Sequence, residues 1–584
     1  MSHKIIGKPE RRVDAWGKVT GKAKFAEDYA VAHQLWGKVL RSKHPHARIL
    51  RIDTAEAAHL EGVEAVLTAK DIPGSKTFGI VVMNQSILAE DRCRYLGDGV
   101  ALVAARTKEI AEEAINRIRV EYEVLPAVTD PEAAMQPDAP KIHGETNTFV
   151  HHKVRKGNIE KGFRDADFVI EKRFKTQFIE HSYIEPEAVL AEPSEQGGVR
   201  ITGSVQNLFS SRRSVAAALN LDLNQVQIIQ STLGGSFGGK DEAMTSLCCR
   251  AALLCLKTGK PVKMVNTREE SMLESYKRHP YVLYYKWGAK NDGTITAMEI
   301  RCIADGGAYA SMSPFVTWRS VVQATGPYFC ENVKTDVYAT YTNNTYTGAM
   351  RGFGSPQVNF AIESMMDELA EKVGMNPLQI RLLNGFERGA VTATGQTLDH
   401  CVSLKEVLSR AAEAIDFERK WKAYREDQSG PRKRGVGLAC SYRGVSLGAE
   451  GTDAAETTVI VQTDGSVIVA SGVTDMGQGA QTQMAQIVAE ELGIGMERIQ
   501  FLNTNTSRVA DSGATVASRG TIMGGSAAKK AAEQVRATLL AAGAEMTGID
   551  TGGLDLEKSY LVNKRTAERL ASFAELAAHT FEKG

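Results

Sequence analysis

The stretch Gly234-Gly235-Ser236-Phe237-Gly238-Gly239-Lys240-Asp241 follows the strand-like run Val226–Ile229 and precedes the helix-like run Met244–Lys257. Its spacing satisfies the G-x-x-x-x-G-K pattern of a phosphate-binding P-loop, which needs Ser or Thr next to hold magnesium. The next residue is Asp241, and Glu242 follows it, so two carboxylates would repel a triphosphate. The stretch therefore disfavours nucleotide triphosphate binding. It predicts either a glycine turn set only by backbone angles or a close approach of backbone to another ligand.

Three further loops of small residues occur later, and two of them stand directly before helix-like runs. Backbone N–H groups at a helix start form an anion site, and Arg351 would add positive charge there. The Gln478 amide offers a donor and an acceptor, and Phe353 either offers a flat face to a planar ligand or fills its own loop. The four loops together predict one large anionic cofactor buried between domains. The three later loops are Met350-Arg351-Gly352-Phe353-Gly354-Ser355-Pro356-Gln357, Thr474-Asp475-Met476-Gly477-Gln478-Gly479 and Thr515-Val516-Ala517-Ser518-Arg519-Gly520.

Composition excludes several classes of protein. The 584 residues suggest about three or four domains, and 70 basic against 70 acidic residues give no net charge. This balance argues against a dedicated nucleic-acid binder and against a polybasic membrane-surface protein. No apolar run approaches the roughly 18–20 residues that span a bilayer, and the start lacks the apolar core of a signal peptide. We therefore expect a cytoplasmic protein that binds neither nucleic acid nor membrane.

The eight cysteines form no C-x-x-C pair, so a zinc ribbon or a ferredoxin-type cluster is not expected within this chain. No H-E-x-x-H occurs either, and the dinucleotide fingerprint of strand, G-x-G-x-x-G and helix is missing. We expect reduced and mostly buried thiols.

Alternating and helical apolar patterns are mixed along the whole chain, which predicts an α+β protein. Arg48–Ile52 and Arg119–Val124 alternate like strands, and Lys108–Ile118 has helical spacing. Asp464-Gly465 between two apolar runs is a hairpin signal. The predicted domains are 1–128, a linker at 129–145 that is rich in Pro, Ala and Asp, a larger region at 146–426, and a last region at 427–584.

The sequence resembles the molybdenum-cofactor subunit of the xanthine dehydrogenase and aldehyde oxidase family from about Arg12 to Val535. The resemblance implies an N-terminal α/β hammerhead-like domain followed by elongated molybdopterin-binding α+β domains. The matching segments, in family order, are Tyr122-Glu123-Val124-Leu125-Pro126, Gly234–Lys240, Arg278-His279-Pro280, Gly306-Gly307-Ala308-Tyr309, Arg351–Gln357 and Thr474–Gly479.

The family resemblance also implies cofactors and partners. The cofactor would be molybdenum–molybdopterin, in its plain or its cytosine dinucleotide form, and the protein would orient it and tune its charge. Electrons would leave through [2Fe–2S] clusters on an iron–sulfur subunit and then reach FAD on a flavin subunit. The substrate would be a small planar N-heterocycle such as a purine or nicotinate, hydroxylated with oxygen from water.

The resemblance also implies a role for each residue of this sequence that matches a functional position of the family, and these residues form a candidate site. Gln206, Phe237, Arg351 and Ala517 would lie beside the metal. Gly235, Phe237, Gly238, Arg351, Gly477, Gln478, Ala517 and Ser518 would bind the cofactor. Asp241, Arg319, Phe353 and Ser441 would contact the substrate, with Arg319 stabilising negative charge on the heterocycle. Asp241 replaces the Glu of purine hydroxylases, and its shorter reach puts xanthine in doubt.

The family's general base is a Glu in a Gly-Glu-Pro context, and this sequence contains no Gly-Glu-Pro. The catalytic residue is therefore expected outside this chain, on a separate small subunit that completes the molybdenum site. A truncated sequence and a degenerate fragment are the alternatives. Two other functions stay open: a non-catalytic cofactor-binding scaffold, and a reductive dehydroxylase of an aromatic thioester.

Overall fold

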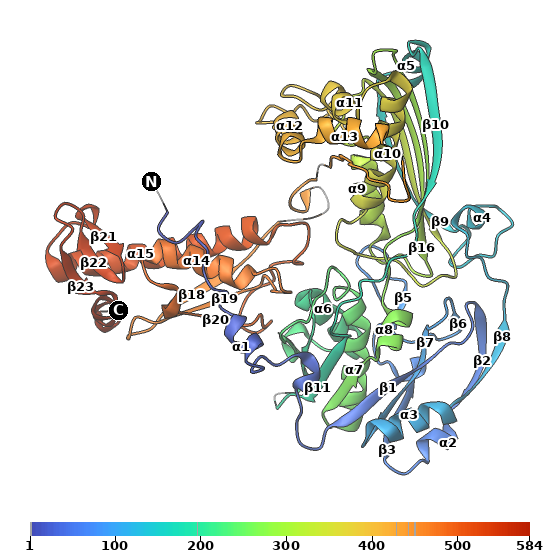
Figure 1. Cartoon of the computed structure of the whole chain (residues 1–584). Helices are drawn as coiled ribbons and strands as arrows, with labels where there is room; N and C mark the ends of the chain where they lie inside the picture. The colour runs from blue at the N-terminus through green and yellow to red at the C-terminus, as the bar shows by residue number, and fades with distance from the viewer. Residues whose placement is uncertain are drawn as a thin grey trace.

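The computed structural model describes residues 3–195, 197–427, 429–441, 443–448, 451 and 453–583. The chain forms three bodies (Figure 1). All three contribute residues to one cavity, which we call the central recess. One body is built on a seven-stranded sheet, one on a five-stranded sheet with helices on one side, and one on small sheets and helices near the C-terminus. This mixed architecture confirms the predicted α+β fold class.

The seven-stranded sheet joins two distant parts of the sequence. Its central pairing is parallel, with Leu35 of β1 opposite Val262 of β14. β7 is buried along its whole length because α3 covers one face and α7 the other. The sheet therefore runs across the boundary predicted at residue 128. In sheet order its strands are β13 (Val226–Gln230), β12 (Val199–Gly203), β11 (Ala188–Pro193), β14 (Val262–Val265), β1 (Leu35–Arg41), β7 (Gly99–Ala105) and β3 (Val63–Thr68).

Helices α6 (Leu208–Leu219) and α7 (Ala243–Thr258) pack on this sheet and begin next to the recess. Asn207 caps α6 by accepting a 3.3 Å hydrogen bond from the backbone N–H of Ser210. The buried side of α7 runs from Ala243 to Cys255 and includes three cysteines. Of the eight cysteines, only Cys401 is exposed, which agrees with the expected buried thiols.

The five-stranded sheet is long and strongly paired. Its strands, in order, are β10 (Phe168–Lys175), β15 (Tyr281–Ala289), β16 (Ile295–Gly307), β17 (Asn332–Tyr341) and β9 (Thr148–Lys156). All neighbours are antiparallel except β16 and β17. Helices α9 (Ser313–Gln323) and α10 (Ser355–Val373) contact this sheet, and both begin at the recess.

The C-terminal body contains two three-stranded sheets (Figure 1). The first holds β18 (Thr457–Val461), β19 (Val467–Ser471) and β20 (Ile499–Phe501), with α14 (Ala480–Leu492) and α15 (Gly525–Thr547) packed together beside it. A π-helical turn, Gly520–Gly524, precedes α15. The second sheet holds β21 (Leu554–Glu557), β22 (Tyr560–Asn563) and β23 (Arg569–Ser572), followed by α16 (Phe573–Lys583).

Shorter elements complete the described chain. They are α1 (Ala15–Val19), β2 (Ala47–Asp53), α2 (Ala55–Ala58), β4 (Thr77–Phe78), β5 (Gln85–Ser86), β6 (Arg92–Cys93), α3 (Lys108–Arg117), β8 (Arg119–Val124), α4 (Pro131–Ala134), α5 (Ile159–Arg164), α8 (Arg268–Glu274), α11 (Pro377–Asn384), α12 (Leu404–Ala414) and α13 (Phe417–Glu426). Within the described ranges, every helix is too short or too polar to span a bilayer.

Candidate active site

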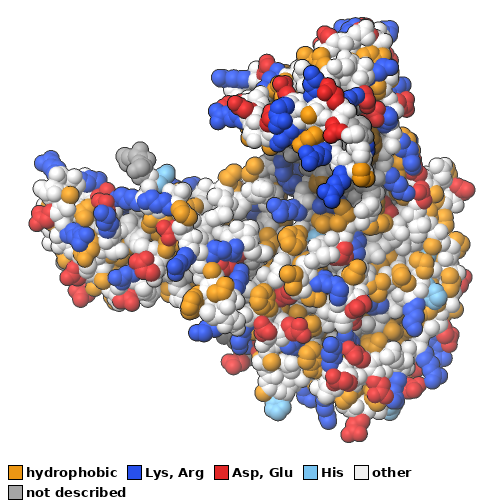
Figure 2. Space-filling view, in the orientation of Figure 1, with side chains coloured by type: hydrophobic (Ala, Val, Ile, Leu, Met, Phe, Trp, Pro, Cys, Tyr) orange, Lys and Arg blue, Asp and Glu red, His pale blue; other side chains and the backbone are white. Residues whose placement is uncertain are grey.

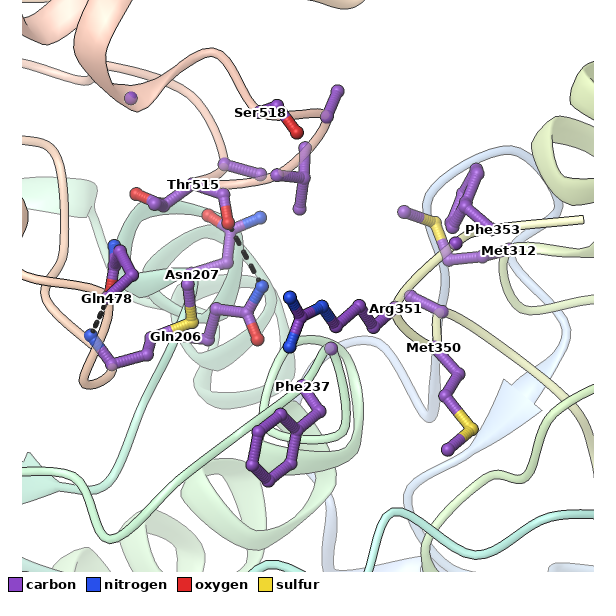
Figure 3. A pocket seen from close by; sticks show the side chains of 18 of the residues that line it. Gln206, Asn207, Phe237, Met312, Met350, Arg351, Phe353, Gln478, Thr515 and Ser518 are labelled. Atoms are coloured by element: carbon purple, nitrogen blue, oxygen red, sulfur yellow. Dashed lines mark hydrogen bonds between the residues drawn. The ribbon is translucent and has the colours of Figure 1, made fainter. Parts of the chain in front are cut away.

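The central recess is a cavity of about 1180 Å³ to which all three bodies contribute. Its walls are loops that precede helices and not the regular faces of the sheets (Figure 3). The lining segments are residues 206–213, 233–238, 312–319, 349–353, 476–483 and 514–521, with Ile80, Arg443 and Leu447 in addition. All four glycine-rich loops predicted from the sequence therefore reach one common cavity.

A backbone hydrogen bond joins the first loop to the second. The N–H of Arg351 donates to the carbonyl of Phe237 over 2.8 Å. The Tyr276 hydroxyl donates to the carbonyl of Gly238. Gly238 has a φ of +103°, and a Cβ there would lie 2.7 Å from the Ala349 carbonyl oxygen, so only glycine fits. The two loops thus form one rigid edge of the cavity.

Lys240 explains why this loop only looks like a P-loop. Its side chain is fully buried, and its Nζ lies 2.6 Å from a Glu185 carboxylate oxygen and over the Tyr183 ring. The same Glu185 carboxylate accepts the N–H of Gly234 over 2.7 Å. Burial lowers the pKa of Lys240, and Glu185 opposes that change. The ammonium therefore stabilises the loop from the protein interior and does not point at a ligand.

Gln206 stands at the centre of the cavity with both ends of its amide held. The side-chain N–H₂ donates to the carbonyl of Thr515 over 3.1 Å, and the amide oxygen accepts from the Ser236 hydroxyl. The residue is only 2% exposed. One of its two amide N–H groups has no hydrogen bond to a described residue, and Figure 3 shows the amide beside the end of the Arg351 side chain. The fixed amide can offer that N–H to a bound group.

The C-terminal body contributes two loops that are tied to each other. The N–H of Thr474 donates to the Thr515 hydroxyl over 2.9 Å, and the Thr474 hydroxyl donates to the Gln206 carbonyl over 3.0 Å. The Gln478 amide folds back on its own loop: it donates to the Thr474 carbonyl over 2.9 Å and accepts from the Met476 N–H over 2.6 Å. The bond from Thr474 to Gln206 joins the C-terminal body to the body of the seven-stranded sheet.

Backbone strain is concentrated around this cavity. Phe237, Phe353, Ala517 and Ser518 all have left-handed φ values, of 55°, 52°, 51° and 56°, although none is glycine. Such conformations are costly for residues with a Cβ and persist where the surrounding structure imposes them, often at ligand sites. Four of them on one cavity mark it as a site where backbone geometry is adapted to a ligand.

The charge and shape of the cavity fit an anionic group. The described lining residues include no Asp, Glu, Lys or His. They include four arginines: Arg213, Arg319, Arg351 and Arg443. Arg213 pairs with Asp511, whereas the Arg351 guanidinium has no hydrogen bond or ion pair with another described residue. Helices α6 and α14 and the turn before α15 open onto the cavity, so their N-terminal N–H groups favour negative charge.

The residues therefore fit a large phosphate-bearing cofactor. Within the described ranges, no cluster of three or more His, Cys, Asp or Glu gathers that could ligate an ion. Gly477 is suited to a close approach, since its φ is +112° and a Cβ there would meet no atom within 4 Å. Gln206, Arg351 and the 477–478 and 517–518 loops are the residues that would hold the group.

Most of the residues predicted from the sequence line this cavity. They are Gln206, Gly235, Phe237, Gly238, Arg319, Arg351, Phe353, Gly477, Gln478, Ala517 and Ser518. In Figure 3 the Phe237 ring extends away from Gln206 and Arg351, and Phe353 lies beside Met312. Arg319 donates to the carbonyls of Ser446 and Leu447 over 2.8 and 3.2 Å, so it also fixes a loop.

Asp241 and Ser441 are not brought to the cavity. Asp241 is 1% exposed, because it lies just before α7 and its side chain is buried behind the loop beside Asn207. Burial raises the pKa of Asp241 to about 6 and that of Glu242 to about 7. Ser441 is exposed on the segment whose Arg443 does line the cavity. The structure gives neither residue the direct substrate contact expected from the sequence.

Several lining residues were not identified from the sequence. Asn207, which caps α6, and Ser210 and Arg213 within that helix are spaced three residues apart, a spacing that could have indicated one helix face toward the ligand. Met312 and Phe315 stand at the start of α9. Arg443 lies in a segment without helix or strand, and no local sequence pattern points to it.

Sequence comparison agrees with this geometry. Residues 20–126 match the a/b hammerhead domain of aldehyde oxidase and xanthine dehydrogenase, and residues 142–385 and 410–584 match two molybdopterin cofactor-binding domains. A probable xanthine dehydrogenase subunit from Bacillus subtilis is 37% identical over 581 residues, which is 99% of this chain and 76% of that protein. The chain belongs to the xanthine dehydrogenase and aldehyde oxidase family of molybdenum hydroxylases.

Other members of the family span a range of named activities. The nicotinate dehydrogenase large molybdopterin subunit of Eubacterium barkeri is 42% identical over 411 residues, covering 70% of this chain and 96% of that subunit. Quinoline 2-oxidoreductase from Pseudomonas putida 86 superposes with a TM-score of 0.91 at 25% identity, covering 99% of this chain and 76% of that one. Aldehyde oxidoreductase from Desulfovibrio gigas superposes with a TM-score of 0.85 at 28% identity, over 92% and 60% of the two chains.

Proposed function

We propose that this chain is the molybdenum-cofactor subunit of a hydroxylase that oxidises a planar N-heterocycle, purine-like or nicotinate-like, with oxygen derived from water. The observation that carries the proposal is the meeting of four strained or glycine-rich loops around Gln206 and Arg351 in one cavity. Relatives named for nicotinate, quinoline and xanthine support a heterocyclic substrate. A bound molybdenum cofactor would supply a two-electron oxidant at this place.

The residues of this chain would hold the cofactor and orient the substrate beside it. The Gln206 amide is fixed at both ends, so one N–H keeps a constant direction toward the cofactor. Arg351 brings a positive charge that would stabilise negative charge on cofactor or substrate. Phe353, with Met312 and Phe315, provides an apolar surface against which a flat ring can pack. Asp241 and Ser441 are left out of these contacts.

We further propose that other subunits complete the enzyme. The described residues that line the cavity include no carboxylate, so a small partner chain would supply the Glu that acts as general base. Electrons would pass to a [2Fe–2S] subunit and to an FAD subunit, because residue patterns for these cofactors are absent from the sequence. The assembly would be a cytoplasmic hetero-oligomer, with a plain or cytosine-dinucleotide molybdopterin.

The test is to purify the chain with its native partners and to measure molybdenum, pterin, iron and flavin per chain. Turnover of hypoxanthine, nicotinate and an aliphatic aldehyde is then followed with an artificial electron acceptor. We expect about one molybdenum per chain and faster oxidation of a heterocycle than of the aldehyde. A complex without molybdenum or pterin would favour the scaffold function, and turnover only in the reductive direction with an aromatic thioester would favour the dehydroxylase.

A further inference from the structure

The start of the chain, drawn in blue in Figure 1, runs along the C-terminal body toward α1. The carboxylate of Glu490, in the last turn of α14, accepts the backbone N–H of Ile5 over 2.6 Å. The hydroxyl of Thr482, in the first turn of the same helix, accepts the backbone N–H of Val13 over 3.1 Å. Residues 4–13, which we call the N-terminal segment, therefore follow α14 from its end to its start.

The same stretch of chain then links two bodies of the molecule. The C-terminal body projects from the rest in the space-filling view (Figure 2). After α1 the chain reaches the body of the seven-stranded sheet, where the carbonyl of Lys24 accepts the N–H of Thr232 over 3.3 Å. The N–H of Ala26 donates to the Glu185 carboxylate over 3.1 Å, and that carboxylate also accepts the N–H of Gly234 on the first glycine-rich loop. The start of the chain is therefore attached on both sides of the cavity.

Arg12 connects the N-terminal segment to the 474–479 loop. Its Nη1 donates to the carbonyl oxygen of Gly477 over 2.7 Å. Its Nε and Nη2 donate to the two carboxylate oxygens of Asp14, each over 2.9 Å, which fixes the plane of the guanidinium. Gly477 lines the cavity, whereas Arg12 is not among the described residues that do so. The Gly477 carbonyl is therefore held from the outer side of the loop.

This hydrogen bond sets the orientation of the peptide between Gly477 and Gln478. The peptide is trans, so its carbonyl and its N–H point in opposite directions. A carbonyl held on the outer side therefore directs the Gln478 N–H toward the cavity. The N–H groups of Gln478, Gly479 and Ala480 have no hydrogen-bond acceptor in the part of the chain that the structure describes. Three consecutive donors at the start of α14 are thus available to a bound anion.

Asp475 gives a second reason for a cation beside this loop. One of its carboxylate oxygens accepts the N–H of Gly477 over 2.8 Å, and the other accepts the N–H of Gln481 over 3.1 Å. The Asp475 side chain is only 7% exposed, so its negative charge lies next to the donors with little screening by water. Arg12 Nη2 lies 3.7 Å from this carboxylate and offsets its charge. Without that cation, the carboxylate would repel a phosphate group at the loop.

Resting on the proposed function, we propose that Arg12 is a positioning residue for the cofactor, because it orients the 474–479 loop so that the N–H groups of residues 478–480 bind a phosphate group of the cofactor. Arg12 acts indirectly, through the Gly477 carbonyl and the Asp475 carboxylate. It lies before residue 20, where the first matched family domain begins. The N-terminal segment is thereby part of the cofactor site, although none of its residues is among the described lining residues.

The experiment measures how fast the loaded complex loses its cofactor. The complex, purified with its native partners, is incubated with inorganic phosphate, and the pterin and molybdenum that remain on the protein are measured over time. Arg12→Gln removes the charge and the planar fork, so it should speed the release of both about 10-fold or more. Arg12→Lys keeps the charge but has no fork, and it should recover part of the retention.

Two control variants distinguish positioning of the loop from a merely structural role of Arg12. Asp14→Asn weakens the same ion pair but leaves Arg12 able to donate to Gly477, so release should stay within about twofold of wild type. Arg11→Gln removes a neighbouring exposed charge that has no ion pair with a described residue, and it should not change release. Equally fast release in Arg12→Gln and Asp14→Asn would overturn the proposal, because it would assign Arg12 to holding the N-terminal segment alone.

Failure of the proposed function gives a different result. If the complex carries molybdenum and pterin but oxidises no heterocycle, only the hydroxylase assignment fails, and the release rates still test Arg12. If it carries neither, calorimetric titration with inorganic phosphate replaces the release rates. Binding that Arg12→Gln weakens about tenfold would then support the proposal, and no binding, or equal binding by wild type and variant, would overturn it. Heterocycle oxidation together with equal release rates in wild type and Arg12→Gln would refute only the role of Arg12.

Discussion

The Gln206 side-chain amide donates to the Thr515 carbonyl over 3.1 Å, although the two residues stand 309 positions apart in the chain. This hydrogen bond connects the body of the seven-stranded sheet to the C-terminal body at the centre of the cavity. The amide oxygen accepts from Ser236 on the glycine-rich loop. One side chain therefore sets the relative position of three loops that line the site.

Replacing Gln206 with Ala should loosen this junction. The Thr515 carbonyl and the Ser236 hydroxyl would lose a buried partner, at a cost of about 1–3 kcal/mol. We expect a melting temperature lower by a few degrees and reduced molybdenum content per chain, measured by calorimetry and elemental analysis. Gln206→Glu, which keeps the acceptor but loses the N–H, should also lower the metal content. Unchanged metal in both variants would contradict the role given to the amide.

Arg351→Met should affect the cofactor or substrate but not the stability of the fold. The guanidinium has no hydrogen bond or ion pair with a described residue, so its removal breaks no such internal bond. We expect an unchanged denaturation midpoint together with at least a roughly 100-fold loss of kcat or a loss of bound pterin. Arg410→Met serves as the surface control. A fall in stability with full activity would assign Arg351 to the scaffold.

Phe353→Ala should weaken the binding of a flat substrate. The ring lines the cavity and belongs to the same apolar cluster as Phe315 and Met312. Its loss removes a stacking surface worth about 1 kcal/mol, so KM should rise about fivefold while kcat changes less. Phe353→Gly, which relieves the left-handed backbone at φ 52°, separates the ring from the strain. A KM equal to that of the wild type in both variants would exclude stacking.

Lys240→Met should be among the most damaging substitutions in the first loop. It would leave the Glu185 carboxylate without its cation behind a loop that depends on that pair. Removing one partner of a buried ion pair costs about 3–5 kcal/mol. Chemical denaturation should show this loss, and Lys529→Met, in an exposed pair with Glu533, should change stability little.

The buried Asp241 and Glu242 carboxyls should make stability depend on pH. Burial raises the pKa of Asp241 from 3.8 to about 6 and that of Glu242 from 4.5 to about 7. Folding therefore favours the protonated forms, and their contribution to stability is present below about pH 4 and lost as pH rises through 6 to 7. Relative to wild type, Asp241→Asn should gain about 3 kcal/mol between about pH 4 and 7.5.

That difference is measured by denaturation of both proteins across the pH range, which cancels the titration of all other groups. Asp222→Asn, at an exposed turn before β13, is the matched substitution. A difference between wild type and Asp241→Asn that does not change with pH would show that the pKa of Asp241 is the same in the folded and the unfolded protein.

Local patterns predicted the elements around the site well. Val226–Ile229 is the strand β13, Met244–Lys257 is the body of α7, and Asp464-Gly465 turns between β18 and β19. Apolar periodicity determines which face of an element is buried, so such elements can be identified from sequence. The glycine-rich loops were identified because positive φ values select glycine.

Those local patterns did not predict where side chains and strands lie in the folded protein. Asp241 follows Lys240 directly, yet the start of α7 directs its side chain into the interior, and no sequence period encodes that direction. Arg443 reaches the cavity from a segment with no regular structure, and only the contact with Gly352 places it there. The pairing of β1 with β14 is likewise set by packing, since no local sequence pattern links two strands that stand so far apart in the chain.

The shared sheet has a consequence for how members of this family can diversify. Leu35 and Val262 lie on adjacent strands, so the hammerhead segment donates three strands to a sheet that the cofactor-binding segment finishes. A recombination breakpoint near residue 128 would join halves of two different sheets. The hammerhead and cofactor-binding segments should consequently be inherited together. Chimaeras that exchange one segment without the other should be insoluble unless the paired strands β1 and β14 are exchanged as well.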